Sequence, residues 1–206
     1  MDGPGSITWE EFVANAEELL KLSEEISDRW EFPGDKNCPG QAYLKRQEKT
    51  LVSIDYPIDE PQEDVDDWTG SRDPFEASSD QKRPLVLEHH VLWSMSYSVP
   101  LIYFNGWKSD FPGINPVSVE VAQRLNNQRL GYGELSQAMH PLLARPFLHL
   151  HPCGSRELLQ LTGKSANPLV SWLSLVAPVA LNLRMRPEYF RLTLSAEQKE
   201  KDTAEE

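Results

Sequence analysis

The sequence predicts an α+β domain, and three patterns in chain order support this fold class. A helical repeat of apolar residues near the N-terminus is followed by alternating apolar and polar residues in the middle of the chain, and then by a second helical repeat. Helices and strands that are segregated in this way are typical of α+β domains. Since the chain has 206 residues and no internal repeat, we expect one domain over residues 1–206.

The first expected element is a helix over residues 8–30. Thr8 followed three residues later by Glu11 forms a capping-box pattern, which marks a helix N-terminus. The opposite face of this helix is acidic, which favours a solvated surface, because a helix on a membrane surface would carry Lys and Arg there. Its apolar residues recur at helical spacing: Phe12, Ala16, Leu19, Leu20, Ile26 and Trp30.

Two short strands are expected next, over residues 41–46 and 49–54, close enough together for a hairpin. Residues 55–67 then hold seven acidic residues and no basic ones. We therefore expect a solvated acidic loop over about residues 55–84. A loop of this length inside a compact domain is either disordered or functional.

The clearest strand begins at Leu85, where apolar and polar residues alternate as far as Ser98. Pro100 interrupts this strand, and Asn105-Gly106 predicts a turn into a neighbouring strand. Further along the chain we expect a helix over residues 117–130, a buried strand over 147–150, a helix over 168–176 and a frayed acidic tail over 195–206.

The charge of the chain excludes two kinds of partner. Thirty-two Asp and Glu against 20 Lys and Arg give a net charge of −12, which repels phosphate backbones and anionic membrane surfaces. We therefore expect no nucleic-acid partner and no stable membrane insertion. The N-terminus lacks the basic and apolar regions of a signal peptide, which predicts a cytoplasmic protein. Two cysteines, Cys38 and Cys153, make no disulfide framework.

The densest chemical segment is residues 147–155. In an extended chain His149 and His151 share one face, and Pro152 ends the strand because it has no N–H to donate. Cys153 then emerges just past the strand end. We predict a helix over residues 156–161, and a thiol beside a helix N-terminus tends to have a lowered pKa.

Cys153 is therefore a candidate nucleophile, and an inert buried cysteine is the competing interpretation. Ser155 suits the N-cap position of the helix that follows. A papain-type protease would need a histidine downstream of its cysteine, and none occurs after position 151. A zinc deaminase would need a second cysteine where Arg156 stands.

A zinc site is a further interpretation of the same segment, because His149, His151 and Cys153 alternate along an extended chain. The fourth ligand would have to come from His89, His90 or Cys38, and no Cys-x-x-Cys pair accompanies these residues.

An ordered set of motifs spans about residues 88–183. The motifs are Tyr97-Ser98-Val99-Pro100-Leu101-Ile102-Tyr103-Phe104, His140-Pro141, Pro146-Phe147, His151-Pro152-Cys153 and Ser171-Trp172-Leu173-Ser174. This set resembles the E2-like conjugating enzymes of autophagy. The resemblance implies an abbreviated ubiquitin-conjugating fold with an N-terminal helix, a four-stranded antiparallel sheet and helices after the cysteine. It places the nucleophile on Cys153 and a strand-end His-Pro on His151 and Pro152.

The resemblance also implies a reaction and its partners. It is strongest for the branch that joins the ubiquitin-like autophagy-related protein twelve to a lysine of autophagy-related protein five. An E1-like enzyme would pass this modifier to Cys153 as a thioester, without a metal or cofactor. Near that thioester, the imidazole of His151 would position the incoming amine or accept its proton, or it would only cap the strand end.

One departure from the family pattern and two alternative functions stay open. The His-Pro-Asn motif of ordinary ubiquitin-conjugating enzymes, whose Asn stabilises the oxyanion, is only partly echoed by His140-Pro141-Leu142. The related enzyme that conjugates its modifier to a lipid has the same His-Pro-Cys tripeptide, although the acidic N-terminal helix argues for a protein acceptor. A non-catalytic interaction module with an inert Cys153 is the other alternative.

Overall fold

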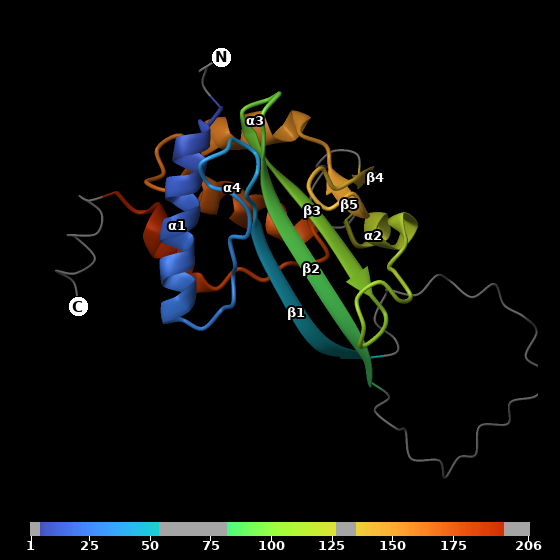
Figure 1. Cartoon of the computed structure of the whole chain (residues 1–206). Coiled ribbons are helices and arrows are strands. Elements are labelled where there is room, and N and C mark those ends of the chain that lie inside the picture. Colours follow the sequence, from blue (N-terminus) through green and yellow to red (C-terminus); the bar gives the residue numbers. More distant parts are fainter. Residues whose placement is uncertain (1–4, 54–81, 127–134, 196–206) are drawn as a thin grey trace, which may run out of the picture.

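The computed structural model describes residues 5–53, 82–126 and 135–195, and over these ranges the chain is α+β, as predicted (Figure 1). Two 3-10 helices, η1 (Ala177–Val179) and η2 (Pro187–Thr193), follow the last α-helix. The other elements are α1 (Trp9–Glu25), β1 (Leu44–Ser53), β2 (Lys82–Ser94), β3 (Val99–Trp107), α2 (Val119–Asn126), β4 (Leu135–Met139), β5 (Pro146–Leu150), α3 (Cys153–Leu161) and α4 (Pro168–Val176).

The strands of the described ranges form one antiparallel sheet in the order β1-β2-β3-β5-β4. This sheet has five strands, one more than the resemblance implied. The additional strand is β4, whose burial is confined to Leu135 and, in part, Ala138, so it carries almost no apolar pattern. The sheet class is therefore confirmed, and its extra edge strand is the new feature.

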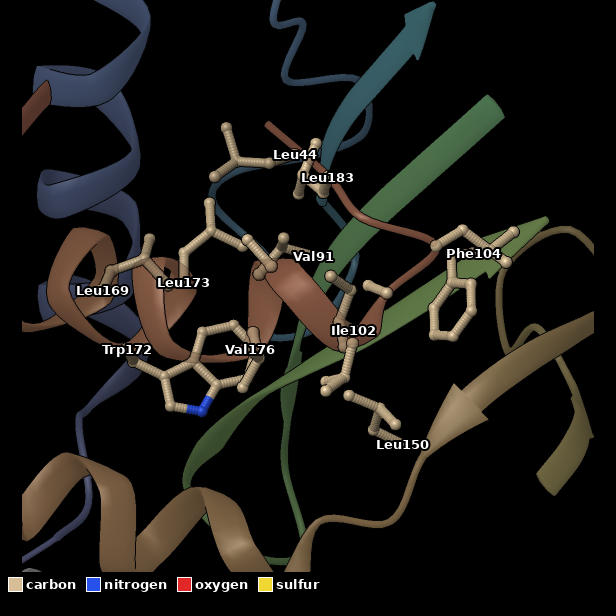
Figure 2. Close-up of a cluster of buried hydrophobic side chains, with 14 of the residues drawn as sticks. Leu44, Val91, Ile102, Phe104, Leu150, Leu169, Trp172, Leu173, Val176 and Leu183 are labelled. Atoms are coloured by element: carbon tan, nitrogen blue, oxygen red, sulfur yellow. The ribbon is translucent and has the colours of Figure 1, made fainter. Parts of the chain in front are cut away.

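One face of the sheet carries the main core, and we call it the inner face (Figure 2). Residues of three neighbouring strands lie side by side in register, with Leu44 opposite Val91 and Val91 opposite Ile102. Helices α1 and α4 lie against this side of the sheet (Figure 1). Because full burial of one such side chain stabilises by roughly 1.5–3 kcal/mol, this cluster fixes the sheet against the helices. Its members from α4 are Leu169, Val170, Trp172, Leu173 and Val176.

Helix α1 begins as predicted but ends earlier. Thr8 Oγ1 accepts the backbone N–H of Glu11 at 3.1 Å, and the Glu11 carboxylate accepts the N–H of Thr8 at 2.7 Å. The helix stops at Glu25 rather than near residue 30, because Ser27 and Arg29 have φ of 56° and 63°. A left-handed conformation of this kind cannot continue an α-helix.

The predicted hairpin over residues 41–54 is wrong, because residues 44–53 form the single strand β1. A hairpin would need a turn at Gln47 and Glu48, and both residues instead pair with β2. Strand β2 begins at Lys82, so residues 82–84 belong to the sheet rather than to the acidic loop. The other residues of that loop lie outside the described ranges, as does the tail from residue 196.

Strand β3 continues through the two places where we expected it to break. Pro100 is paired with Trp93, and the turn between β2 and β3 lies at residues 95–98 instead. Gly106 lies within the strand, where a Cβ atom would come within 2.9 Å of Val117 Cγ2. The glycine is therefore explained by close packing rather than by a turn.

The remaining predicted helices are present, but two of them begin at other residues than predicted, and residues 127–130 lie outside the described ranges. Helix α4 has both predicted ends, and the Asn167 side chain caps it by accepting the N–H of Val170 at 3.0 Å. Helix α2 covers residues 119–126 of the predicted 117–130. Helix α3 begins at Cys153 rather than Arg156, so Ser155 lies inside the helix and is not its N-cap.

Candidate active site at the end of β5

Cys153 is the first residue of α3, directly after the end of β5. Pro152 is the N-cap, and its carbonyl accepts the N–H of Ser155 at 3.0 Å. The backbone of Cys153 therefore lies in the first helical turn, where the helix dipole favours an anion. A reactive thiolate is favoured at such a position.

His151 lies between the end of β5 and the N-cap, and its side chain is exposed. His149, two residues earlier, is buried against the Tyr103 ring at 4.8 Å between centroids, and its Nδ1 lies 3.4 Å from Ser136 Oγ. Burial lowers the pKa of His149, and the nearby His151 lowers it further.

The face of the sheet opposite the main core, which we call the outer face, is lined by rings. His90, Tyr103 and His149 form one row across three strands, since His90 is opposite Tyr103 and Tyr103 is opposite His149. The next row along β5 brings in Phe147, whose ring centroid is 4.9 Å from that of His90. The residues 140–145 cover these rings, because His140 packs on Phe147 at 5.1 Å.

A hydrogen-bonded chain of three buried polar side chains lies within this face. Glu88 Oε1 is 2.8 Å from His90 Nε2, and His90 Nδ1 is 3.0 Å from His140 Nε2. Sequence reasoning placed Glu88 and His90 on the polar side of a strand and did not predict this chain. Alternation alone cannot reveal it, because it does not show that a second layer covers the polar side.

Two of the three residues that could have supplied a fourth zinc ligand, His89 and His90, make other hydrogen bonds in the structure. His89 lies on the inner face with its Nε2 2.7 Å from the Ala180 carbonyl oxygen, and both ring nitrogens of His90 are occupied. Within the described ranges, no group of three or more His, Cys, Asp or Glu side chains is arranged to hold a metal. Cys38 lies in an exposed turn of the loop before β1.

The helix, antiparallel sheet and helix order, with a cysteine at the junction of β5 and α3, is that of the E2-like conjugating enzymes. The chain belongs to the family described as autophagocytosis associated protein, active-site domain, whose model matches residues 11–185. This match extends from α1 to just before η2 and includes residues 151–153.

Three curated relatives carry one name, ubiquitin-like-conjugating enzyme ATG10. The human protein is 28% identical over 211 residues, which cover 87% of this chain and 90% of the relative. The Arabidopsis thaliana protein is 31% identical over 111 residues, or 45% of this chain and 47% of the relative. The Dictyostelium discoideum protein is 28% identical over 117 residues, or 46% and 50%.

These comparisons confirm the resemblance seen in the sequence and identify the chain as an E2-like transferase of ubiquitin-like conjugation in autophagy. In the part of the chain that the structure describes, no helix is long and apolar enough to cross a membrane.

Proposed function

We propose that Cys153 carries a ubiquitin-like modifier as a thioester and that the chain transfers this modifier to a lysine of an acceptor protein. The observation that supports the proposal most is the position of Cys153, at the first residue of α3 and inside the matched active-site domain. The preceding His151-Pro152 ends the strand and leads the chain directly into that helical turn.

The proposed reaction has two acyl transfers. In the first, the Cys153 thiolate attacks the C-terminal glycine carbonyl of the modifier, held as a thioester on an E1-like enzyme, and the thiolate of the E1-like enzyme leaves. In the second, a neutral lysine amine attacks the new thioester carbonyl, a C–N bond forms and the C–S bond to Cys153 breaks. Cys153 leaves as a thiolate, and the amine loses its proton to a base. A serine would be a poorer nucleophile and leaving group.

The proposed modifier is autophagy-related protein twelve, and the proposed acceptor is autophagy-related protein five. The similarity to proteins named ATG10, which extends over most of this chain for the human relative, supports this pair. The acidic residues of α1 are exposed, which disfavours an anionic lipid surface as the acceptor platform. The exposed acidic residues are Glu10, Glu11, Glu17, Glu18, Glu24 and Glu25.

A mass-shift assay tests the proposal. Incubation of the chain with the E1-like enzyme, the modifier and ATP should give an adduct that thiol reductants remove. Cys153→Ala should abolish this adduct, and Cys153→Ser should give an oxyester that resists reductants.

Cys38→Ser is the matched control, because Cys38 is the exposed cysteine of a loop and lies in no helix N-terminus. It should form the adduct as wild type does. Absence of an adduct with wild type would contradict the enzymatic proposal and favour the interaction module, and loss of the adduct only in Cys38→Ser would move the nucleophile to Cys38.

A further inference from the structure

The chain of Glu88, His90 and His140 continues into the backbone of the turn that precedes β5. His140 Nδ1 accepts the backbone N–H groups of Leu142 and Leu143, both at 3.2 Å. The chain thus runs from a carboxylate on β2 through two imidazoles to two peptide groups. Glu88 is 5% exposed and both histidines are fully buried, so water does not replace these partners.

The backbone end of this chain determines where every proton lies. A peptide N–H can only donate, so His140 Nδ1 must carry a lone pair and the proton of this neutral ring sits on Nε2. His140 therefore donates to His90 Nδ1, and His90 donates from Nε2 to Glu88. A further proton on His90 Nδ1 would face the Nε2–H of His140. A further proton on His140 Nδ1 would face the N–H groups of Leu142 and Leu143, and the bonds to the turn would be lost.

Burial and nearby charges also oppose an added proton on the imidazole of His90 or His140. The pKa of His140 is lowered to about 4, first by burial and then by His90 and Arg145. Burial likewise lowers the pKa of His90, and Lys45 and Arg145 add to this effect, whereas Glu88 opposes it. The other titratable side chains packed against these rings are Tyr43 and Tyr103, and His149 packs on Tyr103 in turn.

The turn held by His140 leads directly into β5. The N–H of His140 donates to the Arg145 carbonyl at 2.8 Å, and the N–H of Ala144 donates to the His140 carbonyl at 3.0 Å. Phe147, the second residue of β5, packs against both imidazoles. The hydrogen-bonded side chains of Glu88, His90 and His140 therefore hold the start of β5, through the backbone bonds of the turn and through ring contacts.

Strand β5 pairs with the middle of the sheet over a short stretch, and its Leu148 and Leu150 side chains pack into the core of the inner face. Its paired residues on β3 are Tyr103 with His149 and Phe104 with Leu148. The side chain of Asn105 adds to this pairing, donating to the Pro146 carbonyl at 3.2 Å and accepting the Leu148 N–H at 3.4 Å. Because this join is short, the ring contacts and the turn on the outer face add a second set of contacts that orients β5, beside Leu148 and Leu150 on the inner face.

We infer that Glu88, His90 and His140 are positioning residues of the transfer reaction: they fix β5 and hence the backbone of residues 151–153. The inference rests on the proposed function of Cys153. These residues do not touch the reacting atoms. They act because acyl transfer is sensitive to displacements of about 1 Å, which can cost on the order of a hundredfold in rate.

The kinetic test compares two substitutions of Glu88 in a single-turnover discharge assay that starts from the preformed thioester. Glu88→Leu leaves the His90 N–H without an acceptor and should slow discharge to the lysine by about tenfold. Glu88→Gln keeps an oxygen that can accept this N–H, so it should discharge within about twofold of wild type. Equal slowing by both variants would overturn the inference.

His89→Leu is the matched control, because His89 is the next residue of β2 and equally buried, but bonds to Ala180 on the inner face. Each variant is assayed at a temperature at which thermal unfolding shows it to be folded. We expect His89→Leu to lower stability without slowing discharge as Glu88→Leu does. If the two slow discharge alike, the effect belongs to stability and the inference fails.

A measurement without enzymatic turnover separates this inference from the proposed function. Nitrogen-15 NMR of the imidazoles should show His90 and His140 as neutral rings protonated on Nε2 between about pH 6 and pH 8. Either the opposite tautomer or a cationic ring in that range would contradict the assigned hydrogen bonds and overturn the inference. If wild type formed no thioester while the NMR result held, the proposed function alone would fail.

Discussion

His151 is the residue whose chemical role depends most on its position. It follows the last residue of β5, its side chain is exposed, and it lies two residues before Cys153. His149 continues the same face of the strand into buried surroundings. An exposed imidazole at this place can reach an incoming amine, which a buried one cannot.

We therefore predict that His151→Ala charges Cys153 at a nearly normal rate but discharges to lysine roughly tenfold more slowly. His151→Asn should show a milder defect because it keeps a donor. Single-turnover discharge from the preformed thioester measures the second step alone. Normal discharge by the alanine variant would remove His151 from the site, and a joint decline of both steps with thermal stability would indicate a structural role.

At the scale of elements, a buried cluster around the Arg46–Asp28 ion pair ties η2 to the sheet and to the segment after α1. Arg46 Nη2 of β1 lies 2.9 Å from Asp28 Oδ1, and the Tyr189 hydroxyl of η2 donates to Asp28 Oδ2 at 2.8 Å. Arg46 also donates to the Arg184 carbonyl at 3.1 Å. This cluster explains how η2, which has little apolar sequence pattern, is held against the fold.

Tyr189→Phe should therefore lower the free energy of unfolding by about 1–2 kcal/mol, because Asp28 loses one of its buried donors. Urea unfolding measures the difference. Tyr97→Phe is the same chemical change at a side chain that is 51% exposed, and it should stay within about 0.5 kcal/mol of wild type. Equal stability of Tyr189→Phe and wild type would show that the hydroxyl contributes nothing to the cluster.

Elements whose signals are local were predicted from the sequence. The capping box of Thr8, the proline at the start of α4 and the apolar run of β5 each depend on a few neighbouring residues. The split of β1 and the turn at Asn105-Gly106 were predicted wrongly. Pairing with β2 kept β1 continuous, and close packing explains Gly106.

The candidate site shows the same division between local and distant signals. Cys153 and His151 are neighbours in the chain, so their strand-end setting could be predicted from residues 147–155. His90 and His140 are 50 positions apart, and their bond exists only because the turn before β5 folds onto the outer face. No local pattern carries that information.

The whole molecule should lose stability as the pH falls below neutrality. Burial keeps His89, His90 and His140 neutral, and it lowers the pKa of His89 and of His140 to about 4. In the unfolded chain a histidine has a pKa of about 6.5. Between these values the unfolded state binds more protons than the folded state, so stability rises with pH.

We expect the contribution of His89 and His140 to the free energy of unfolding to be fully present above about pH 6.5 and to decline by roughly 1 kcal/mol per pH unit for each of the two down to about pH 4. Urea unfolding at several pH values measures this slope. His89→Leu should reduce the slope by one histidine's share. A stability that stays constant or increases between pH 7 and pH 5 would contradict the buried neutral state of these rings.

The short join between β3 and β5 has a consequence for the motions of the native state. Strands β1, β2 and β3 pair along most of their lengths, whereas β5 meets β3 at Tyr103 and Phe104. Amide hydrogens of β2 should therefore exchange with solvent only on global unfolding. Those of the β4–β5 hairpin should exchange through a local opening that has a lower free energy than global unfolding. The hairpin that leads to Cys153 would then unfold as a cooperative unit of its own, separately from the rest of the sheet.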